Sequence, residues 1–371
     1  MRIGVPKETA ANERRVALTP DAAGRLAKTG GGGGGGHEVL IERGAGTAAF
    51  FPDEAYSAAG AKLGDRASIL GQSDIVLHVQ APNPAELTQY RESSALVAFF
   101  QPVPDLLRQL AQRKLTAFSL VLLPRITRAQ PMDVLSSQAT VAGYKAVLLA
   151  ATAAGRLLPM LVTAAGTVPA ARVLVLGAGV AGLQAIATAR RLGAIVSAFD
   201  VRPAVKEQVQ SLGAIFLEMA IEEHAETAGG YAKELSEETH KKELAFLAKA
   251  ARDADIIITT AAIPGKKAPI LITTAAVESM KPGSVIVDLA AETGGNCELT
   301  QAGSEIVRNG VAILGPLNLP STMPINASQM YAKNISAFLG HIVQDGKLRL
   351  DFEDQIIRDT CVTHAGEVRK S

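Results

Sequence analysis

Short apolar runs recur along the first 123 residues, with helix-like segments between them: RIGVP, HEVLIERGAG, DIVLHVQ, ALVAFFQ and LTAFSLVLL. Strands that alternate with helices of about 10–15 residues are typical of βαβ units and of a parallel sheet. The alternation restarts at ARVLVLGAGVAG and continues through GAIVSAFD, GAIFLEM, DADIIITTA, GSVIVDLA and VAILG, over about residues 172–315. The pattern therefore predicts an α/β protein with two Rossmann-like domains, each built on a parallel sheet.

Two longer segments with helical spacing connect these domains. SSQATVAGYKAVLLAATAAG is rich in good helix formers and closes at Gly155, which predicts a linking helix. SQMYAKNISAFLGHIV predicts a late helix that returns the chain to the first domain. We expect a discontinuous first domain of residues 1–135 plus 322–371, and a second domain of residues 136–321, joined by long helices.

Composition and charge exclude several classes of protein. With 371 residues, of which 48% are hydrophobic, the chain is long enough for two domains that each bury a core. A net charge of +1 without a long basic block argues against nucleic-acid binding. The start, MRIGVPKETAANERR, lacks the apolar core of a secretory signal, and Cys297 and Cys361 show no CxxC spacing. We therefore expect a reduced, cytoplasmic environment and no disulfide framework.

Neither a metal site nor a membrane span is expected. The six histidines are scattered without HxxxH spacing, and a single histidine at a strand end, such as His78, is more often structural than catalytic. The richest apolar region, residues 157–189, is interrupted by Pro159, Pro169, Arg172 and three glycines. It is therefore not predicted to cross a membrane by itself.

Two segments have a biased composition. Gly30 to Gly36 is a run of seven glycines where a helix should hand over to a strand, and because one glycine suffices for a C-cap we expect a flexible surface loop or a peculiarity of this sequence. IEEHAETAGGYAKELSEETHKKE is highly charged, which favours a solvated loop and helix. Its Gly229 and Gly230 beside Tyr231 also permit a hinged lid.

A dinucleotide-binding fingerprint opens the second domain. Gly177, Gly179 and Gly182 form GxGxxG directly after an apolar strand and before a helix, so they permit a tight turn, backbone approach to a pyrophosphate and close helix–strand packing. Asp200 ends the next strand 18 residues after Gly182, where a carboxylate accepts both ribose hydroxyls. The alternative is a glycine-rich packing turn. The context favours dinucleotide binding by the domain of residues 136–321, with the nucleotide cleft between the two domains.

The same carboxylate indicates which nucleotide binds. A 2′-phosphate next to Asp200 would bring like charges together, so we expect NAD(H) rather than NADP(H). We expect Arg202 to lie along the adenine or to face the pyrophosphate. The segment TTAAIPGKKAP follows another predicted strand, so Ala262, Ile263, Pro264 and Gly265 should border the cofactor, although a plain turn fits this spacing equally well.

With these motifs assembled, the sequence resembles the NAD(H)-binding component of the proton-translocating NAD(P) transhydrogenases, a family related to alanine dehydrogenase. The resemblance runs almost end to end, through GVPKE, RRVALTP, RAQPMDVLSSQ, VLGAGVAGLQA, AFDVRP, AETAGGYAKE, TTAAIPGKKAP, MKPGSVIVDLAAETGGNCE and CVT. It implies that four residues hold the nicotinamide and its ribose for hydride transfer: Arg125, Gln130, Asp133 and Ser136. It also implies that the loop at Tyr231 closes over the nucleotide, which favours the lid. We include Ile126, Thr127, Val180, Val201 and Gly230 among the cofactor-binding residues.

The dehydrogenase relatives differ at the groups that handle protons. They keep a lysine and a histidine that bind and protonate the keto acid, and an arginine matching Arg15, whereas this chain has His78 and Gln101 at the first two positions. A dehydrogenase aspartate is likewise replaced by Glu292. Reduction of a ketone needs a general acid, but hydride transfer between two nicotinamides needs only two rings held at about 3–3.5 Å without water.

This difference explains the polar stretch PRITRAQPMDVLSSQ at residues 124–138. Gln130 and Ser136 would grip the ring and ribose, and Arg125 with Asp133 would form a charge pair that fixes the loop. The alternative is that Asp133 or Ser136 caps the linking helix.

The predicted function is the NAD(H) side of transhydrogenation, NADH + NADP⁺ ⇌ NAD⁺ + NADPH. Because only one dinucleotide fingerprint is present and the chain ends at Ser371 without membrane helices, we expect an NADP(H)-binding partner subunit and a membrane-spanning subunit. The resemblance also implies a homodimer, peripheral on the cytoplasmic face of the membrane. The alternatives are a soluble alanine-dehydrogenase-like enzyme and a non-catalytic NAD-binding regulator.

Overall fold

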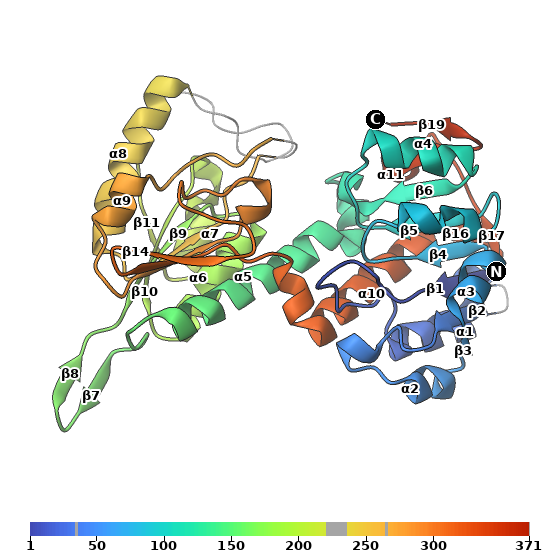
Figure 1. The fold of residues 1–371 in the computed structure, drawn as a ribbon, viewed down its shortest axis with the longest axis horizontal. Coiled ribbons are helices and arrows are strands. Elements are labelled where there is room, and N and C mark those ends of the chain that lie inside the picture. Colours follow the sequence, from blue (N-terminus) through green and yellow to red (C-terminus); the bar gives the residue numbers. More distant parts are fainter. Residues whose placement is uncertain (34–35, 220–235, 264–265, 371) are drawn as a thin grey trace. The chain divides into compact units, whose positions relative to one another are not determined.

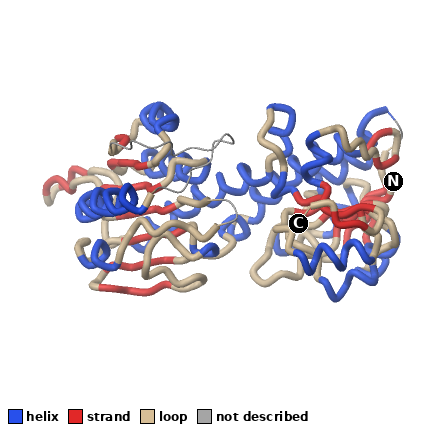
Figure 2. The backbone as a smooth tube through the Cα atoms, turned by 90° about the horizontal axis from the view of Figure 1, so that it is seen from above, coloured by secondary structure: helices blue, strands red, loops and turns tan. Residues whose placement is uncertain are grey.

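The computed structural model describes residues 1–33, 36–219, 236–263 and 266–370. The chain divides into two compact units, the first of residues 1–138 and 320–371 and the second of residues 139–319. Each unit has a central sheet with helices on both sides of the strands (Figure 2). The predicted α/β class with two Rossmann-like sheets is confirmed.

The sheet of the first unit has eight strands in the order β19-β18-β6-β5-β4-β1-β2-β3. Strands β1 to β6 pair in parallel, whereas β18 and β19 are antiparallel, so the sheet is mixed rather than purely parallel as predicted. Its strands are β1 Arg2–Val5, β2 Glu38–Glu42, β3 Lys62–Gly64, β4 Ile75–Leu77, β5 Ala95–Ala98, β6 Thr116–Ser119, β18 Cys361–His364 and β19 Glu367–Val368. A separate small hairpin pairs β16 Val343–Gln344 with β17 Lys347–Leu348.

Helices cover both faces of this sheet. Along β4, Ile75 and Leu77 enter one apolar cluster while Val76 enters another, as expected for a strand buried on both faces. The helices are α1 Pro20–Gly33, α2 Asp53–Ala58, α3 Arg66–Gln72, α4 Pro104–Gln112, α10 Pro324–Ile342 and α11 Gln355–Thr360. The 3₁₀ helices are η1 Thr47–Ala49, η2 Pro84–Gln89, η3 Leu120–Leu122 and η4 Thr127–Met132.

The glycine run is not wholly a loop. Helix α1 extends through Gly33, so the first four glycines are helical although glycine is about 1 kcal/mol less favourable there than alanine. Gly34 and Gly35 lie outside the described residues. Gly36 has a steric reason to be glycine, because a Cβ there would lie 1.7 Å from the Ala27 carbonyl oxygen. The predicted surface loop is therefore shorter than the run.

The sheet of the second unit has seven strands in the order β11-β10-β9-β12-β13-β15-β14. All pair in parallel except β14, which is antiparallel to β15. The strands are β9 Arg172–Leu176, β10 Ile195–Phe199, β11 Ile215–Phe216, β12 Ile256–Thr259, β13 Val285–Asp288, β14 Glu305–Arg308 and β15 Val311–Leu314. Helices are α6 Val180–Arg191, α7 Lys206–Ser211, α8 Glu237–Asp253 and α9 Thr274–Glu278, with 3₁₀ helices η5 Pro203–Val205 and η6 Ala291–Thr293.

A hairpin that the hydrophobic pattern did not predict projects from the second unit (Figure 1). It consists of β7 Leu161–Thr163 and β8 Gly166–Val168, and every residue of both strands is exposed. Both strands are only three residues long, which is too short for a recognisable alternation of apolar and polar positions.

Helix α5 Val134–Ala153 is the predicted linking helix, and with η7 Leu319–Thr322 it crosses the division between the units. Among the described residues, α5 is the one helix whose length and apolar composition would suffice to cross a membrane. Its Ala146, Val147 and Ala150 pack into the apolar core of the second unit, which is the ordinary role of an apolar helix in a folded domain.

Candidate functional site

The glycine turn has the geometry that the fingerprint predicts. Gly177 follows β9 with φ +93°, and a Cβ there would lie 2.7 Å from the Thr260 Oγ1 atom. A Cβ on Gly182 would lie 1.9 Å from the Gly177 carbonyl oxygen, so helix α6 could not approach the strand with any larger residue. These two glycines are required by the fold itself.

Gly179 differs, because a Cβ there would meet nothing within 4 Å. It is the N-cap residue of α6 and makes no side-chain capping bond, and Val180 at the first helical position is exposed. The first N–H groups of the helix therefore face open space beside a residue without a side chain, which is the environment that a pyrophosphate requires.

Helix α5 approaches this turn closely from the other side. A Cβ on Gly143 would lie 2.1 Å from the Ala181 carbonyl oxygen, so the backbones of α5 and α6 meet at the first turn of α6. Position 143 is thus constrained by the helix that carries the fingerprint.

Asp200 follows β10, and its carboxylate is almost completely buried. Its Oδ2 accepts the Ala178 N–H at 2.7 Å and the Arg202 Nη2 at 2.7 Å. Its Oδ1 accepts the Arg202 backbone N–H at 2.9 Å and Nε at 2.8 Å. A carboxylate accepts about four hydrogen bonds, so these contacts use its capacity.

The expectation for Arg202 was therefore wrong. Its guanidinium does not extend along a nucleotide but folds back on Asp200 in a two-pronged ion pair, because a separation of two residues brings the planar guanidinium onto the carboxylate. Ribose hydroxyls could reach Asp200 only if the Arg202 side chain moved. The half-buried Val201 lies between the two.

The end of β12 completes this group. Thr260 Oγ1 donates to the Gly177 carbonyl at 3.0 Å, which joins the β12 end to the glycine turn. Asn296 holds Ala261 from both sides, accepting its N–H at 3.1 Å and donating to its carbonyl at 2.9 Å. Ala262 is exposed and Ile263 half-buried, whereas Pro264 and Gly265 lie outside the described residues, as do Gly230 and Tyr231 of the predicted lid.

Asn296 was not identified from the sequence. It is buried, and its own N–H donates to Asp288 Oδ2 at 2.7 Å. Asp288 also accepts bonds from Thr259, Cys297 and Thr300, so one buried carboxylate organises the loop that presents Asn296. A charged residue at the end of the apolar run VIVD was a signal in the sequence, but its partners could not be deduced.

The sheet order brings the predicted groups of this unit together. Strand β9 lies between β10 and β12, so the glycine turn, Asp200 and the Ala261 segment share the carboxyl edge where open α/β sheets bind ligands. The open cradle at Gly179 and the carboxylate at the neighbouring strand end fit NAD(H). Among the described residues, no group of histidine, cysteine, aspartate and glutamate could hold a metal ion.

The polar stretch lies in the first unit, around η4 and the start of α5. Arg125, Thr127 and Gln130 are exposed and Ile126 is half-buried. Asp133 accepts the Ser136 N–H at 2.9 Å and the Ser136 hydroxyl at 2.6 Å, so the capping alternative is correct for Asp133. The ion pair between Arg125 and Asp133 stays a prediction.

Behind this stretch, Arg15 belongs to a buried polar network of the same unit. Its Nε and Nη2 donate to Glu13 at 2.8 and 2.7 Å, and its Nη1 donates to Gln138 at 2.8 Å. Gln80 also donates to Glu13, at 2.8 Å. The guanidinium that matches a dehydrogenase arginine is thus engaged by side chains of the chain itself.

His78 is equally engaged. Its Nε2 lies 2.6 Å from the Tyr90 hydroxyl, and its Nδ1 lies 3.5 Å from Glu8 Oε1. Burial raises the pKa of Tyr90, so this hydroxyl keeps its proton. Gln101 is exposed, and Glu292 accepts the Asn318 N–H at 2.7 Å. The groups at these positions are satisfied inside the fold.

Comparison with known proteins yields a family and close relatives. The family described as alanine dehydrogenase/PNT matches over both of its domains, the N-terminal domain over residues 4–142 and the C-terminal domain over residues 146–371. NAD(P) transhydrogenase subunit alpha of Haemophilus influenzae is 48% identical over 372 residues, covering 99% of this chain and 71% of that protein. A Rhodospirillum rubrum protein, named as the first piece of a divided NAD(P) transhydrogenase subunit alpha, is 48% identical over 380 residues, covering 99% of this chain and 97% of that protein. A crystal structure of transhydrogenase from Sinorhizobium meliloti has a TM-score of 0.86 at 43% identity, covering 100% of this chain and 99% of that one.

Proposed function

The chain belongs to the alanine dehydrogenase/PNT family, and we propose that it is the NAD(H)-binding subunit of a proton-translocating NAD(P) transhydrogenase. It is an oxidoreductase that uses NAD(H), and it passes hydride directly between NADH and NADP⁺ held on a partner subunit. The observation that carries this choice is the state of the former acid–base positions, where His78 is bonded to Tyr90 and Gln101 has no titratable proton.

The chemistry asks the protein for orientation rather than for protons. When bound, NAD(H) supplies the hydride. Transfer to a second nicotinamide moves no proton at the reacting carbon, so the protein must align two rings and exclude water. Arg125, Gln130 and Ser136 hold the carboxamide and ribose, and Asp133 fixes the Ser136 hydroxyl. Ile126 and Thr127 border the same site.

The second unit holds the rest of the nucleotide. Gly179 and Val180 present the N–H groups of α6 to the pyrophosphate, and Asp200 binds the adenosine ribose after exchanging its bonds with Arg202. Val201, Ala262 and Ile263 border the cofactor. For Pro264, Gly265, Gly230 and Tyr231 the same role stays a prediction.

The proposal includes partners. An NADP(H)-binding subunit supplies the second nicotinamide, and a membrane-spanning subunit couples hydride transfer to proton translocation, which places this chain on the cytoplasmic face of a membrane. A homodimer is supported by the projecting β7–β8 hairpin, where Met160 and Val162 expose 62% and 79% of their surface. Exposed apolar groups on an isolated two-stranded hairpin favour a protein partner.

One assay separates the proposed function from its alternatives. The full chain is mixed with NADH, an NADP⁺ analogue of distinct absorbance and a purified NADP(H)-binding subunit, and we expect the analogue to be reduced only when both proteins are present. Oxidation of NADH by pyruvate and ammonia without the second protein would establish a dehydrogenase instead. NADH binding without either reaction would indicate a regulator.

A further inference from the structure

The segment η4, which carries Gln130, has little to fix it from within. It is a 3₁₀ helix of six residues with Pro131 inside, so one backbone donor is missing. Its flanking backbone bonds are short-range, from Ala129 N–H to the Ile126 carbonyl at 3.0 Å and from Asp133 N–H to the Gln130 carbonyl at 3.2 Å. A defined position for Gln130 must therefore come from contacts outside the segment.

Two of these contacts are apolar. Ala129 and Met132 are buried in the main apolar cluster of the first unit, together with Tyr331 and Ile335 of α10. These contacts hold one face of η4 against α10. They are non-directional, so by themselves they do not fix the rotation of the segment that determines where Gln130 points.

Two further contacts are polar and directional. Asn334 of α10 donates its Nδ2–H to the Pro131 carbonyl at 2.8 Å, while its Oδ1 is buried without a hydrogen-bond partner. Arg128 Nη1 donates to Asp354 Oδ2 at 2.8 Å. These bonds lie on either side of Gln130, and they join η4 to residues 203 and 226 positions away along the chain.

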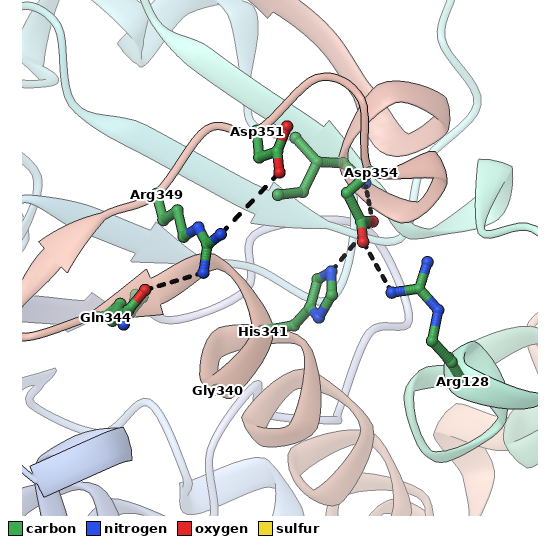
Figure 3. A pocket seen from close by; sticks show the side chains of 9 residues that line it. Arg128, Gly340, His341, Gln344, Arg349, Asp351 and Asp354 are labelled. Atoms are coloured by element: carbon green, nitrogen blue, oxygen red, sulfur yellow. Dashed lines mark hydrogen bonds and ion pairs between the residues drawn. The ribbon is translucent and has the colours of Figure 1, made fainter.

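Asp354 is a rigid acceptor for Arg128. Its Oδ1 caps α11 by accepting the Ile356 N–H at 2.8 Å and lies 3.2 Å from His341 Nε2, so the carboxylate is held by two other elements (Figure 3). Arg128 itself is 60% exposed at the side chain and borders a pocket of about 640 Å³. Without this pair its guanidinium would move freely in solvent.

We propose that Asn334 and Asp354 are positioning residues for hydride transfer, which fix η4 through Pro131 and Arg128 and so set the position of Gln130. This inference rests on the proposed function, because it assigns these contacts to the alignment of the nicotinamide. It requires that their loss slows transfer more than it weakens NADH binding, since the second unit supplies the contacts to pyrophosphate and adenosine and a displacement of about 1 Å costs a reacting geometry about 100-fold.

The test uses the full chain with an NADP(H)-binding subunit and compares Asp354→Asn with Asp351→Asn. Asparagine is as good an N-cap as aspartate, so α11 keeps its cap while the charge opposite Arg128 is lost. Asp351 lines the same pocket, but its carboxylate is 4.0 Å from Arg349 and makes no contact with Arg128. We expect Asp354→Asn to lower the single-turnover transfer rate about tenfold with less than a twofold change in the Kd of NADH, and Asp351→Asn to change neither.

A second pair tests the other anchor. Asn334→Ala removes the bond to Pro131, and Asn326→Ala removes an amide from an exposed position of the same helix. We expect the same split between rate and affinity for the first variant and no effect for the second. Unfolding by urea shows whether each variant remains folded under assay conditions.

A mutant cycle identifies the partner. Arg128→Gln should lower the rate as much as Asp354→Asn, the double variant should lower it no further, and Arg128→Lys should restore part of it. Equal rates for wild type, Asp354→Asn and Asn334→Ala would overturn the inference while leaving the proposed function intact. A wild-type chain that transfers no hydride to the partner would overturn the proposed function itself.

Discussion

The glycine turn after β9 and the 3₁₀ segment η4 are both assigned to the same nucleotide, yet they are built in opposite ways. The turn is defined by backbone: φ +93° at Gly177 and a Cβ position at Gly182 that would lie 1.9 Å from a carbonyl oxygen leave one possible path. The segment η4 is defined by side chains that reach it from α10 and the cap of α11. A turn of the first kind is fixed by its own sequence, whereas a segment of the second kind is only as precise as its distant partners.

The largest expected effect comes from Gly182→Ala. The added methyl must displace the Gly177 backbone or push α6 off the sheet, so we expect a loss of about 3–5 kcal/mol in the free energy of unfolding and no measurable NADH binding. Urea unfolding followed by circular dichroism measures it. A variant as stable as wild type would show that the turn has room to relax and that the comparison is drawn too sharply.

Gly179→Ala separates binding from folding at the same turn. Its Cβ meets no protein atom within 4 Å and its φ of −76° suits alanine, so stability should change by less than about 0.5 kcal/mol. The methyl would occupy the space assigned to the pyrophosphate, and we expect NADH affinity to fall about 30-fold. Fluorescence titration of NADH measures the Kd, and an unchanged value would remove Gly179 from the site.

On the side of η4, Gln130→Asn shortens one grip by a methylene. We expect the transfer rate to fall about tenfold while the Kd of NADH stays within a factor of two, because most contacts to the nucleotide lie elsewhere. Single-turnover kinetics and NADH titration supply the two numbers. Equal losses in both would make Gln130 a binding residue rather than an aligning one.

The smallest effect is a change in acid stability. Burial disfavours the ionised form of Asp354, but the hydrogen bonds from Arg128, His341 and the Ile356 N–H lower its pKa from 3.8 to about 2. A depressed pKa stabilises the fold above about pH 4 and loses that contribution as the pH falls towards 2. We expect the stability difference between wild type and Asp354→Asn to shrink by at most about 1 kcal/mol from pH 5 to pH 3. Urea midpoints at both pH values measure it, and a constant difference would mean that the pair does not act through charge.

The same contrast explains how much the sequence could predict. The strand alternation and the glycine turn are local patterns, so the two sheets and the strand–turn–helix at Gly177 followed from the sequence alone. Arg202 was misplaced because sequence spacing says nothing of side-chain direction. Asn296 and Asn334 were missed because their partners lie 35 and 203 residues away. The antiparallel strands β18 and β19 and the β7–β8 hairpin are too short to carry a period.

Gly143 shows how far the influence of the turn extends. It touches no group assigned to the nucleotide, yet any side chain there would collide with the Ala181 carbonyl in the first turn of α6. A saturation screen for coenzyme retention would therefore score position 143 as sensitive, and a map of contact residues drawn around the coenzyme would omit it. The footprint of the binding reaction on the gene is wider than its footprint on the surface.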